Sequence, residues 1–561
     1  MTDVLELARG RLAGGDLGGA LTQLERAMAE APLDPRVHVL HGRLLRMQGR
    51  HEDSVRALDR ARELDPGDSE ASVEKAALAL EQRDFAAATA LLSDVLGRDA
   101  ANARAQFELG RLHRMRGAFE PAIACQRAAI AADPRLVEAY CELGWMLNER
   151  REPDQALEVY ERALAVDPED ITVNHNLGMT LGKLEHYERA LEILEKLCAR
   201  LPGDYSPSWL NLATALAANG EVRRAADVYE RILAVEPNNV YARWNRSHFL
   251  LAERQYERGW RDYAWRFMVD GLGLPRLIPH PPWLGEPLEG KSILVSCEQG
   301  LGDQIMFASC LPEIIERAGS VVVECRDRLE ALFRRSFPRA RVIGSQLQQD
   351  PPWLKEVGEV DFHASMGSLP ALLRNSAADF PVHQGYLKAD PARVEYWRAR
   401  LAALGPGRKV GLSWRGGTHA TRQRLRSLGL ADLHPLLEQA GNRFVSLQYG
   451  DCAGELEAYT RERGIPVAHW QEAIDDYDET AALCSALDLT ISVCTSVIHL
   501  NGALGRPVWI MVPSAPEWRY GFAGARMDWY PSARLYRQAE RSGWAPVLAL
   551  ICADLAQLDG D

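Results

Sequence analysis

The sequence predicts an all-helical repeat array at the N-terminus, followed by an α/β region of two doubly wound domains that face a cleft. Three observations support this fold class. Prolines recur about every 34 residues through the first 240 residues, and short apolar runs alternate with helical stretches beyond residue 290. A segment rich in proline and glycine separates the two patterns.

The length, composition and net charge of the chain limit the classes of function that it can have. At 561 residues the chain is long for one hydrophobic core, so we expect about three or four units. The content of 47% hydrophobic and 25% charged residues is typical of globular domains. The net charge of −13 and the pI near 5.7 disfavour a nucleic-acid partner, because phosphate backbones are bound by an excess of lysine and arginine.

Neither a signal peptide nor a membrane span is visible in the sequence. The opening residues MTDVLELARGRL contain an early acid and no apolar core, and no run of about 18 apolar residues follows. We therefore expect a soluble, cytoplasmic protein without membrane insertion. The ten cysteines form no C-x-x-C pair, which disfavours both a zinc site and a disulfide framework. Most are expected to be small buried hydrophobic residues.

The repeat is defined by four positions that keep the same spacing. Its prolines lie at 32, 66, 134, 168, 202 and 237, with alanine at the skipped position 100. When each proline is numbered 32, small residues fall at position 8 (Ala8, Gly42, Ala76, Gly110, Gly144, Gly178, Ala213) and at position 20 (Ala20, Ser54, Ala88, Ala122, Ala156, Ala190, Ala225). Position 24 is large and apolar except at Gln126. Small side chains allow the two helices of a unit to approach closely.

This pattern resembles the tetratricopeptide repeat (TPR) family. The resemblance implies seven units over residues 1–239 and a partial eighth, so that the TPR solenoid spans 1–270. Stacked repeats form a superhelix with an extended concave surface, and such a surface binds another protein.

Position 6 lies on the first helix of each unit, which lines the concave face in this family. Along the chain this position carries Glu6, Leu40, Glu74, Glu108, Glu142, Asn176, Asn211 and Asn245. An asparagine both donates and accepts hydrogen bonds, so a row of them can bind a peptide backbone of any sequence. The run resembles the asparagine ladder of protein O-GlcNAc transferases, which implies that Asn176, Asn211 and Asn245 bind an acceptor. The alternative is that they are tolerated polar residues on a wet helix face.

The second half begins after a linker at 271–290. Strand-like runs follow, and a break at 401–409 divides the region into domains at 291–400 and 406–561. The expected strands are 293–297, 321–325, 410–414, 444–448, 487–493 and 507–512. Strands that alternate with helices indicate parallel sheets, which bind ligands at the carboxyl ends of their strands. We therefore expect each of the two domains to bind a ligand at this edge of its sheet.

The stretch LVSCEQGLGDQIMF, residues 294–307, predicts a strand, a glycine turn and a helix that starts near Asp303. Gly300 and Gly302 of the turn are assigned to the donor-binding residues. A dinucleotide fingerprint would need a third glycine where Ile305 stands, and a Walker motif would need G-K-[ST]. Asp303 either caps the helix or serves as a functional acid at the mouth of the cleft.

A second motif, LDLTISVCTSVIHLNGALGRPVWIMVP, spans residues 487–513 and reads as strand, turn, helix and strand. Thr495 and Ser496 open the helix, whose free N–H groups suit a phosphate. His499 falls on the same face, at i+4 from Thr495. The alternative interpretation of His499 is a core or capping residue.

Further donor-binding candidates surround this motif. The segment THATRQRLRS holds Arg422, Arg424 and Arg426 at alternate positions, so their guanidiniums could converge on a phosphate, or the loop could simply be solvated. Trp414 and Arg415 follow a strand and could contact the base or sugar. In EWRYG, Arg519 is expected to line the donor pocket, while Trp518 either lines the pocket or packs.

No metal is expected. The D-x-D at 476–478 precedes a helix, and capping explains it.

The combination of EQGLGDQIMFASCLP, VGLSWRGG and SVCTSVIHLNGALGRPVW resembles bacterial TPR proteins whose C-terminal half is a GT-B glycosyltransferase related to the ADP-heptose transferases. Within this group the chain is similar to the TPR-bearing flagellin glycosyltransferases, over essentially its whole length. The resemblance implies that the domain at 291–400 lies on the acceptor side and that the domain at 406–561 binds the nucleotide-sugar. It also implies that Asp303 is the general base, that 493–496 is the phosphate turn and that His499 lies on the phosphate-binding helix. One departure is Cys494, where many relatives have an aspartate.

The leading functional hypothesis is an inverting, metal-independent protein O-glycosyltransferase that acts on serine or threonine, with flagellin as the acceptor. Its only cofactor would be a nucleotide-sugar, and the resemblance suggests first a CMP-linked nonulosonate and then ADP-heptose. Two alternatives remain open. One is a non-catalytic TPR scaffold with a vestigial GT-B half, which Cys494 favours, and the other is a glycosyltransferase that acts on a surface glycan.

Overall fold

The computed structural model describes residues 2–13, 16–201, 206–270, 272, 278–346, 351–417, 423–539 and 543–558. It forms two compact units, Met1–Pro202 and Gly203–Asp561. The division falls within the repeats, so the last repeat helices belong to the same unit as the α/β region. Each unit is described by itself.

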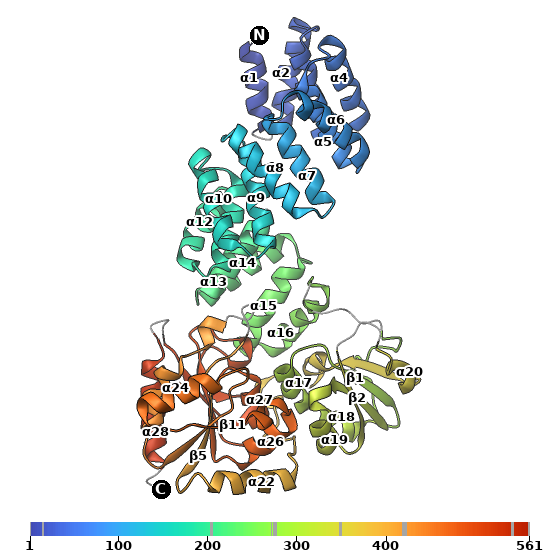
Figure 1. Cartoon of the computed structure of the whole chain (residues 1–561). Coiled ribbons are helices and arrows are strands. Elements are labelled where there is room, and N and C mark those ends of the chain that lie inside the picture. Colours follow the sequence, from blue (N-terminus) through green and yellow to red (C-terminus); the bar gives the residue numbers. More distant parts are fainter. Residues whose placement is uncertain are drawn as a thin grey trace. The chain divides into compact units, whose positions relative to one another are not determined.

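The first unit consists of helix pairs, coloured blue to teal in Figure 1. Its helices are α1 (Thr2–Ala13), α2 (Leu17–Glu30), α3 (Pro35–Met47), α4 (His51–Leu64), α5 (Ser69–Glu81), α6 (Phe85–Arg98), α7 (Ala103–Met115), α8 (Phe119–Ala132), α9 (Val137–Glu149), α10 (Pro153–Val166), α11 (Ile171–Lys183) and α12 (Tyr187–Arg200). Several begin at an aspartate whose carboxylate accepts a backbone N–H of the first turn, as Asp34, Asp68 and Asp84 do.

The small residues at position 8 pack against position 24 of the same repeat. A Cβ added to Gly42 or Gly178 would lie 2.6 Å from the side chain of Leu58 or Leu194. Gln126, the exception at position 24, is buried, and its Nε2 donates to the backbone oxygen of Phe107 at 3.2 Å. The predicted close approach of the paired helices is therefore confirmed.

The second unit begins with repeat helices. These are α13 (Ser206–Ala218), α14 (Val222–Val235), α15 (Val240–Ala252) and α16 (Tyr256–Tyr263), and the 3₁₀ segment η1 (Ala264–Met268) follows. The ring of Trp260 makes edge-to-face contacts with Phe307, Trp518 and Trp529, which come from the α/β region. The last repeat thus shares a hydrophobic core with the α/β region.

The first sheet of the α/β region has four parallel strands in the order β3-β2-β1-β4. They are β1 (Ser292–Ser296), β2 (Ser320–Arg326), β3 (Ala340–Ser345) and β4 (Phe362–Ser365). Its helices are α17 (Leu301–Phe307), α18 (Leu311–Arg317), α19 (Glu330–Ser336), α20 (Leu354–Val357) and α21 (Pro370–Leu373), with the 3₁₀ segment η4 (Met366–Ser368) before α21.

The second sheet has seven strands in the order β10-β11-β9-β8-β5-β6-β7, all parallel except for the β10–β11 pair. They are β5 (Arg408–Ser413), β6 (Asn442–Ser446), β7 (Ala468–His469), β8 (Leu489–Val493), β9 (Val508–Val512), β10 (Arg526–Met527) and β11 (Tyr530–Arg537). Hydrophobic cores cover both faces of this sheet, one with α24 (Ala453–Arg463) and α28 (Ala545–Gln557) and the other with α26 (Tyr477–Ala486) and α27 (Ser496–Ala503). Figure 1 shows α24 and α28 on one side of the sheet and α26 and α27 on the other.

The helices of the second domain are α22 (Pro391–Ala402), α23 (His434–Leu437), α24 (Ala453–Arg463), α25 (Gln471–Asp475), α26 (Tyr477–Ala486), α27 (Ser496–Ala503) and α28 (Ala545–Gln557). The 3₁₀ segments η7 (Gln423–Arg426) and η9 (Trp518–Tyr520) lie in the connections that follow β5 and β9. The predicted fold class, a helical repeat array followed by two parallel sheets, is confirmed.

Each sheet has one point where the strand order changes direction. In the first sheet β2 and β3 lie on one side of β1 and β4 on the other, so the switch lies between β1 and β4. In the second sheet the switch lies between β5 and β8. Open α/β sheets bind ligands in the crevice beyond the carboxyl ends of the strands at such a point.

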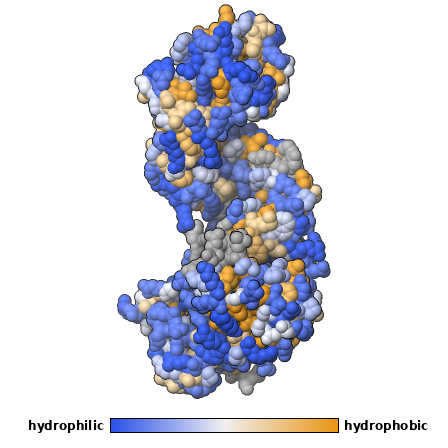
Figure 2. Space-filling model, turned by 90° about the vertical axis from the view of Figure 1, so that its right-hand side faces the viewer, coloured by the Kyte–Doolittle hydropathy of each residue, from blue (hydrophilic) through white to orange (hydrophobic). Residues whose placement is uncertain are grey.

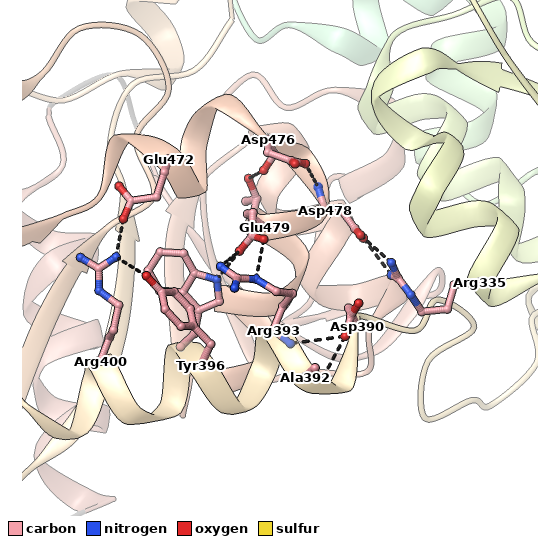
Figure 3. A network of polar contacts seen from close by, with 12 residues as sticks. Arg335, Asp390, Ala392, Arg393, Tyr396, Arg400, Glu472, Asp476, Asp478 and Glu479 are labelled. Carbon is pink, nitrogen blue, oxygen red and sulfur yellow. Dashed lines mark hydrogen bonds and ion pairs between the residues drawn. The ribbon is translucent and has the colours of Figure 1, made fainter.

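Helix α22 connects the two domains and is held by ion pairs to α25 and α26 (Figure 3). Arg393 pairs with Glu479, whose carboxylate also accepts from the buried Trp397 indole at 2.8 Å. Asp476 caps α26 by accepting from the Asp478 N–H at 2.8 Å, as predicted for the D-x-D. Asp478 in turn pairs with Arg335 of α19 at 2.5 Å.

Hydrophilic residues dominate the face of the molecule seen in Figure 2, with hydrophobic residues in small groups between them. Among the residues that the structure describes, no helix is long and apolar enough to cross a membrane.

Candidate functional site

The loops after β5 and β8 touch at the switch point of the second sheet. A Cβ added to Gly416 would lie 2.9 Å from the Cys494 carbonyl oxygen and 3.1 Å from the Thr495 methyl group. Thr495 is the N-cap of α27, and its hydroxyl lies 3.3 Å from Ser492 Oγ. The predicted strand-turn-helix of the second motif therefore opens α27 at the edge where this sheet is expected to bind a ligand.

Helix α17 of the first domain packs directly on α27 of the second domain. Gly302 makes this possible, because a Cβ there would lie 3.0 Å from His499 Cδ2 and 3.5 Å from the Ser496 Cα. The N-cap of α17 is Gly300, and Asp303 lies in its first turn. The glycine turn and the phosphate turn, which are far apart in the sequence, are thus brought together, with Ser496 and His499 at their contact.

Asp303 is the first of four charged side chains that alternate in sign. Arg519 Nη2 lies 2.8 Å from Asp303 Oδ1, and Arg519 Nη1 lies 3.4 Å from Glu517 Oε2. Glu517 also pairs with Arg426, which comes from η7. Two arginines, Arg426 and Arg519, therefore lie beside the start of α27.

Burial raises the pKa of Asp303 above the ordinary aspartate value. The Arg519 guanidinium opposes this shift and lowers the pKa, Glu517 raises it, and a hydrogen bond from the Gly300 backbone lowers it. The net direction is upward, so the carboxylate binds a proton more readily than an exposed aspartate does. Such a shift suits a general base.

His499 is buried, and its Nδ1 lies 3.1 Å from the Tyr530 hydroxyl. Its pKa lies well below the usual histidine value, first because of burial and then because of the positive charges of Arg519 and Arg426. The neutral ring packs against Gly302. The alternative interpretation of a packed core histidine therefore describes its contacts in this structure.

A pocket of about 290 Å³ opens beside Asp303. Gly300, Asp303, Trp518 and Arg519 line one part of it, so Trp518 both packs in the core and faces the pocket. The other part comes from the last repeat and its extension, through Trp244, His248, Tyr263, Arg266 and Phe267. The pocket thus lies where the repeats meet the two sheets within the second unit.

Two contacts hold the glycine turn against the last repeat. Arg266 donates to Glu298 Oε1 from Nε at 3.1 Å and from Nη2 at 2.6 Å. Tyr263 and Gln299 are also hydrogen bonded, with the Gln299 amide 2.7 Å from the Tyr263 hydroxyl. Sequence reasoning missed these residues, although the polar pair Glu298 and Gln299 directly before the glycines was the available signal.

Two predicted donor contacts, Trp414 and Arg415, have protein partners in this structure. Trp414 is fully buried in the core of the second domain, with Val410, Leu412 and Leu428. Its indole therefore supports the sheet edge instead of facing a ligand. Arg415 pairs with Glu455 of α24, and its role in donor binding stays a prediction.

The basic loop is only partly described. Arg422 lies outside the described residues, and for Arg424 only the backbone, in η7, is described. The Arg426 side chain is described, and it lies 3.5 Å from the Cys494 carbonyl oxygen and pairs with Glu517.

Cys494 lies at the phosphate turn as a buried neutral thiol. Its Sγ is 3.6 Å from the Met511 carbonyl oxygen. Burial raises the pKa of Cys494 to about 12, so the thiol keeps its proton at neutral pH. The turn therefore carries no negative charge where many of the resembling proteins have an aspartate.

The acids at position 6 of the repeats are neutralised by arginines. Glu74 pairs with Arg43 at 2.8 Å and with Arg46 at 3.1 Å, and Glu142 pairs with Arg114 at 2.7 Å. Glu108 is buried beside Arg111 at 2.7 Å.

The other polar residues at position 6 are asparagines. Asn176, Asn211 and Asn245 are half-buried on α11, α13 and α15. Asn176 lines a hollow of about 510 Å³ between α7, α9 and α11, together with Arg111, Arg114 and Trp145. All three helices are first helices of their repeats, the helices predicted to line the concave face.

Within the described ranges, no group of three or more His, Cys, Asp or Glu side chains is arranged to hold a metal ion.

Comparison with known families agrees with the repeat pattern. Residues 5–69 and 73–236 match two models described as tetratricopeptide repeat. The chain therefore has an N-terminal array of tetratricopeptide repeats, followed by an α/β region that contains two parallel sheets.

Among curated proteins, the chain is similar to protein FlbA of Caulobacter vibrioides. The two are 34% identical over 377 residues, which cover 64% of this chain and 62% of FlbA. The chain thus spans about three fifths of the length of the curated relative that it matches. Because the matched segment is longer than the repeat array, the similarity extends into the α/β region.

Among solved structures, PilF of Pseudomonas aeruginosa is 21% identical, with a TM-score of 0.34, and the match covers 37% of this chain and 94% of that chain. TTC0263, a TPR protein of Thermus thermophilus, is 20% identical, with a TM-score of 0.29, and the match covers 32% of this chain and 98% of that chain.

Proposed function

We propose that the chain is an inverting protein O-glycosyltransferase of the GT-B type, which transfers a sugar from a nucleotide-sugar to a serine or threonine of a protein held by the repeats. The observation that carries the proposal is the contact of Asp303 and its glycine turn with Arg519 and the start of α27. A base for the acceptor hydroxyl and cations for a donor phosphate are needed side by side in such a reaction.

Asp303 is the general base in this proposal. As the acceptor oxygen attacks the anomeric carbon, its proton passes to the Asp303 carboxylate, and the bond from that carbon to the phosphate oxygen breaks. One displacement of this kind inverts the anomeric centre. The raised pKa of Asp303 favours proton uptake, a contribution of about 10²–10⁴-fold in rate for a positioned base.

The leaving nucleotide is stabilised by groups at the second switch point. The N-terminus of α27, with Thr495 and Ser496, offers backbone N–H groups to a phosphate. Arg426 and Arg519 lie beside it and supply positive charge without a metal ion. A phosphate would compete with Glu517 and Asp303 for these guanidiniums, so donor binding would free the base from Arg519.

The acceptor is a protein in this proposal, and a bacterial flagellin is the acceptor that the sequence resemblance favours. Asn211 and Asn245 belong to the second unit, and Asn245 lies on α15, which also contributes Trp244 and His248 to the pocket around Asp303. The sugar would be a CMP-linked nonulosonate or ADP-heptose, and the protein would act in the cytoplasm.

The donor site is tested by thermal stability with CMP, ADP, UDP and GDP. A nucleotide at about 100 times its dissociation constant stabilises the domain that binds it by about 2.7 kcal/mol. We expect one nucleotide to do so in the wild type and to lose most of this effect in Arg519→Gln. The matched control is Arg398→Gln, an exposed arginine on α22.

Cys494 favours a second candidate, a non-catalytic scaffold with a vestigial donor site. The buried neutral thiol differs from the aspartate of many resembling proteins. If none of the four nucleotides raises the melting temperature and no transfer is detected, the scaffold is the better account.

A further inference from the structure

We propose that a second cavity, next to the pocket around Asp303, binds an apolar side chain of the acceptor polypeptide beside the serine or threonine that is glycosylated. We call this cavity the flank pocket. It is lined by Phe267, Trp283, Glu298, His363, Leu369 and Leu372 among others, and its volume is about 430 Å³. This inference rests on the proposed function and names the class of acceptor that the site would select.

The flank pocket lies at the switch point of the first sheet. Ser296 at the end of β1 and Ser365 at the end of β4 both line it, as do Cys297, directly after β1, and Ser368 of the 3₁₀ segment η4. The carboxyl ends of strands at a switch point are where open α/β sheets bind ligands. Each of the two sheets therefore has a ligand crevice, and the proposed donor site occupies only the one in the second sheet.

The walls of the flank pocket are mainly apolar. Leu284 and Leu372, which line it, are 72% and 37% exposed, while Trp283 and Leu369 form a buried part of the wall. Covering such surface is favourable by about 25 cal/mol for each Å² removed from water. A leucine- or phenylalanine-sized side chain would gain this energy on entering the pocket.

The flank pocket and the pocket around Asp303 share two lining residues, Phe267 and Glu298. A ligand that extends from one into the other must pass these residues. One polypeptide can do this, because neighbouring side chains of an extended chain are about 3.3 Å apart along the strand and point to different sides.

Glu298 lies where the flank pocket meets the pocket around Asp303, and its carboxylate can accept a hydrogen bond from a peptide. Its Oε1 accepts two hydrogen bonds from Arg266, whereas its buried Oε2 has no hydrogen-bond partner among the described residues. A buried acceptor without a partner costs about 1–3 kcal/mol. A peptide N–H at the junction would satisfy Oε2 and fix the direction of the chain.

A second sugar fits the flank pocket less well. Ser296 and His363 are hydrogen bonded to each other at 2.8 Å, and Ser368 accepts from Arg266 at 2.7 Å. These polar atoms are already engaged, so most hydroxyls of a sugar would lose their hydrogen bonds to water without replacement. An apolar side chain carries no such cost.

The first test is binding, measured by calorimetry on full-length Asp303→Asn, which cannot complete the transfer. The probes are synthetic peptides of about eleven residues with one serine, flanked on either side by leucine or by glycine. We expect the leucine peptides to bind at least about tenfold more tightly, since filling an apolar pocket discriminates by about 10–200-fold for a methylene or more.

Two further variants locate the effect. Ala371→Trp, added to the Asp303→Asn chain, fills the flank pocket from α21 and should abolish the preference for leucine. Ala402→Trp, which adds the same ring to an exposed position of α22, should leave the preference intact. Equal affinity for leucine and glycine peptides, or no binding of either at about 1 mM, would overturn the inference.

A second arm separates this inference from the proposed function. The wild-type chain is given the same peptides with CMP-, ADP-, UDP- and GDP-sugars, and peptide mass is measured. Leucine-selective binding without transfer of any sugar would leave the flank pocket standing and would contradict the glycosyltransferase. Transfer at equal kcat/KM to all peptides would support the enzyme and contradict the flank pocket.

Discussion

At the scale of single residues, the pKa of Asp303 is set by opposing influences. Burial raises it, and Arg519, which lies 2.8 Å from the carboxylate, lowers it. The Gly300 backbone also contributes, so the carboxylate both supports the first turn of α17 and faces the pocket. Helix capping and a catalytic role, which the sequence left as alternatives, are therefore compatible.

This balance predicts a shift in the pH dependence of Arg519→Gln. Without the guanidinium, the pKa of Asp303 rises further, and the base is protonated over a wider acidic range. The acidic limb of the kcat/KM profile should therefore move to higher pH, in addition to an overall loss from weaker donor binding. Arg519→Lys keeps the charge and should retain a limb near that of the wild type. An unchanged limb in Arg519→Gln would mean that Asp303 is not the titrating base.

How far the sequence predicts the site can be judged from particular residues. Asp303, Arg519 and Thr495 lie in local motifs, and the structure brings them to one place. Trp414 was misplaced because a residue directly after a strand can point into the core or toward the ligand edge, and only packing decides between them. Arg266 and Glu298 were missed because their ion pair joins segments 32 residues apart, with no local pattern.

At the scale of secondary-structure elements, the packing of α17 on α27 depends on the absence of a side chain at Gly302. We expect Gly302→Val to separate the two helices, because its Cβ alone would lie 3.0 Å from the His499 ring. Nucleotide stabilisation and transfer should both fall strongly. Gly454→Val is the matched control, since Gly454 lies in the first turn of α24 with no atom within 4 Å of an added Cβ. Equal losses in the two variants would contradict the role of this contact.

The network around α22 predicts a difference in stability (Figure 3). In Glu479→Ala the fully buried Trp397 loses its hydrogen-bond acceptor, and Arg393 loses its ion pair. We expect a loss of about 1–3 kcal/mol in the unfolding free energy of this unit. Glu395→Ala removes only an exposed pair with Arg398 and should cost about 0–1 kcal/mol.

Chemical unfolding followed by tryptophan fluorescence compares these two variants. Equal midpoints would show that the ion pairs around α22 do not stabilise the second unit.

The elements that the sequence predicted were those with long apolar runs. The six expected strands correspond to β1, β2, β5, β6, β8 and β9. The sequence did not predict β3, β4, β7, β10 and β11. Some of these strands are short or polar, such as β4 (Phe362–Ser365), and β11 contains Pro531. Such strands form because a neighbouring strand offers its edge, which is a tertiary effect and leaves little local signal.

At the scale of the whole molecule, the repeats run through both compact units. The acids of the first repeats are paired with arginines. Asn176, Asn211 and Asn245 are half-buried, and their side-chain amides can both donate and accept hydrogen bonds. The role of these asparagines as an acceptor ladder stays a prediction.

That prediction can be tested with the triple variant of Asn176, Asn211 and Asn245, each changed to alanine. Each lost hydrogen bond is worth about 0.5–1.5 kcal/mol, so kcat/KM for a protein acceptor should fall by about tenfold or more. Nucleotide stabilisation should not change. Asn174→Ala is the control, since the Asn174 amide donates to the carbonyl oxygens of Pro168 and Asp170 in its own segment. Unchanged kcat/KM in the triple variant would contradict a role of these three asparagines in acceptor binding.

The central claim is that Asp303 activates an acceptor hydroxyl for sugar transfer. The most direct measurement is the intact mass of flagellin after incubation with the chain and a nucleotide-sugar, with wild type and Asp303→Asn side by side. We predict added sugar mass with the wild type and a rate at least about 100-fold lower with the variant, while both proteins are stabilised equally by the nucleotide. Asp327→Asn, on the 3₁₀ segment before α19, should behave as wild type. Sugar transfer by Asp303→Asn at the wild-type rate would contradict the claim.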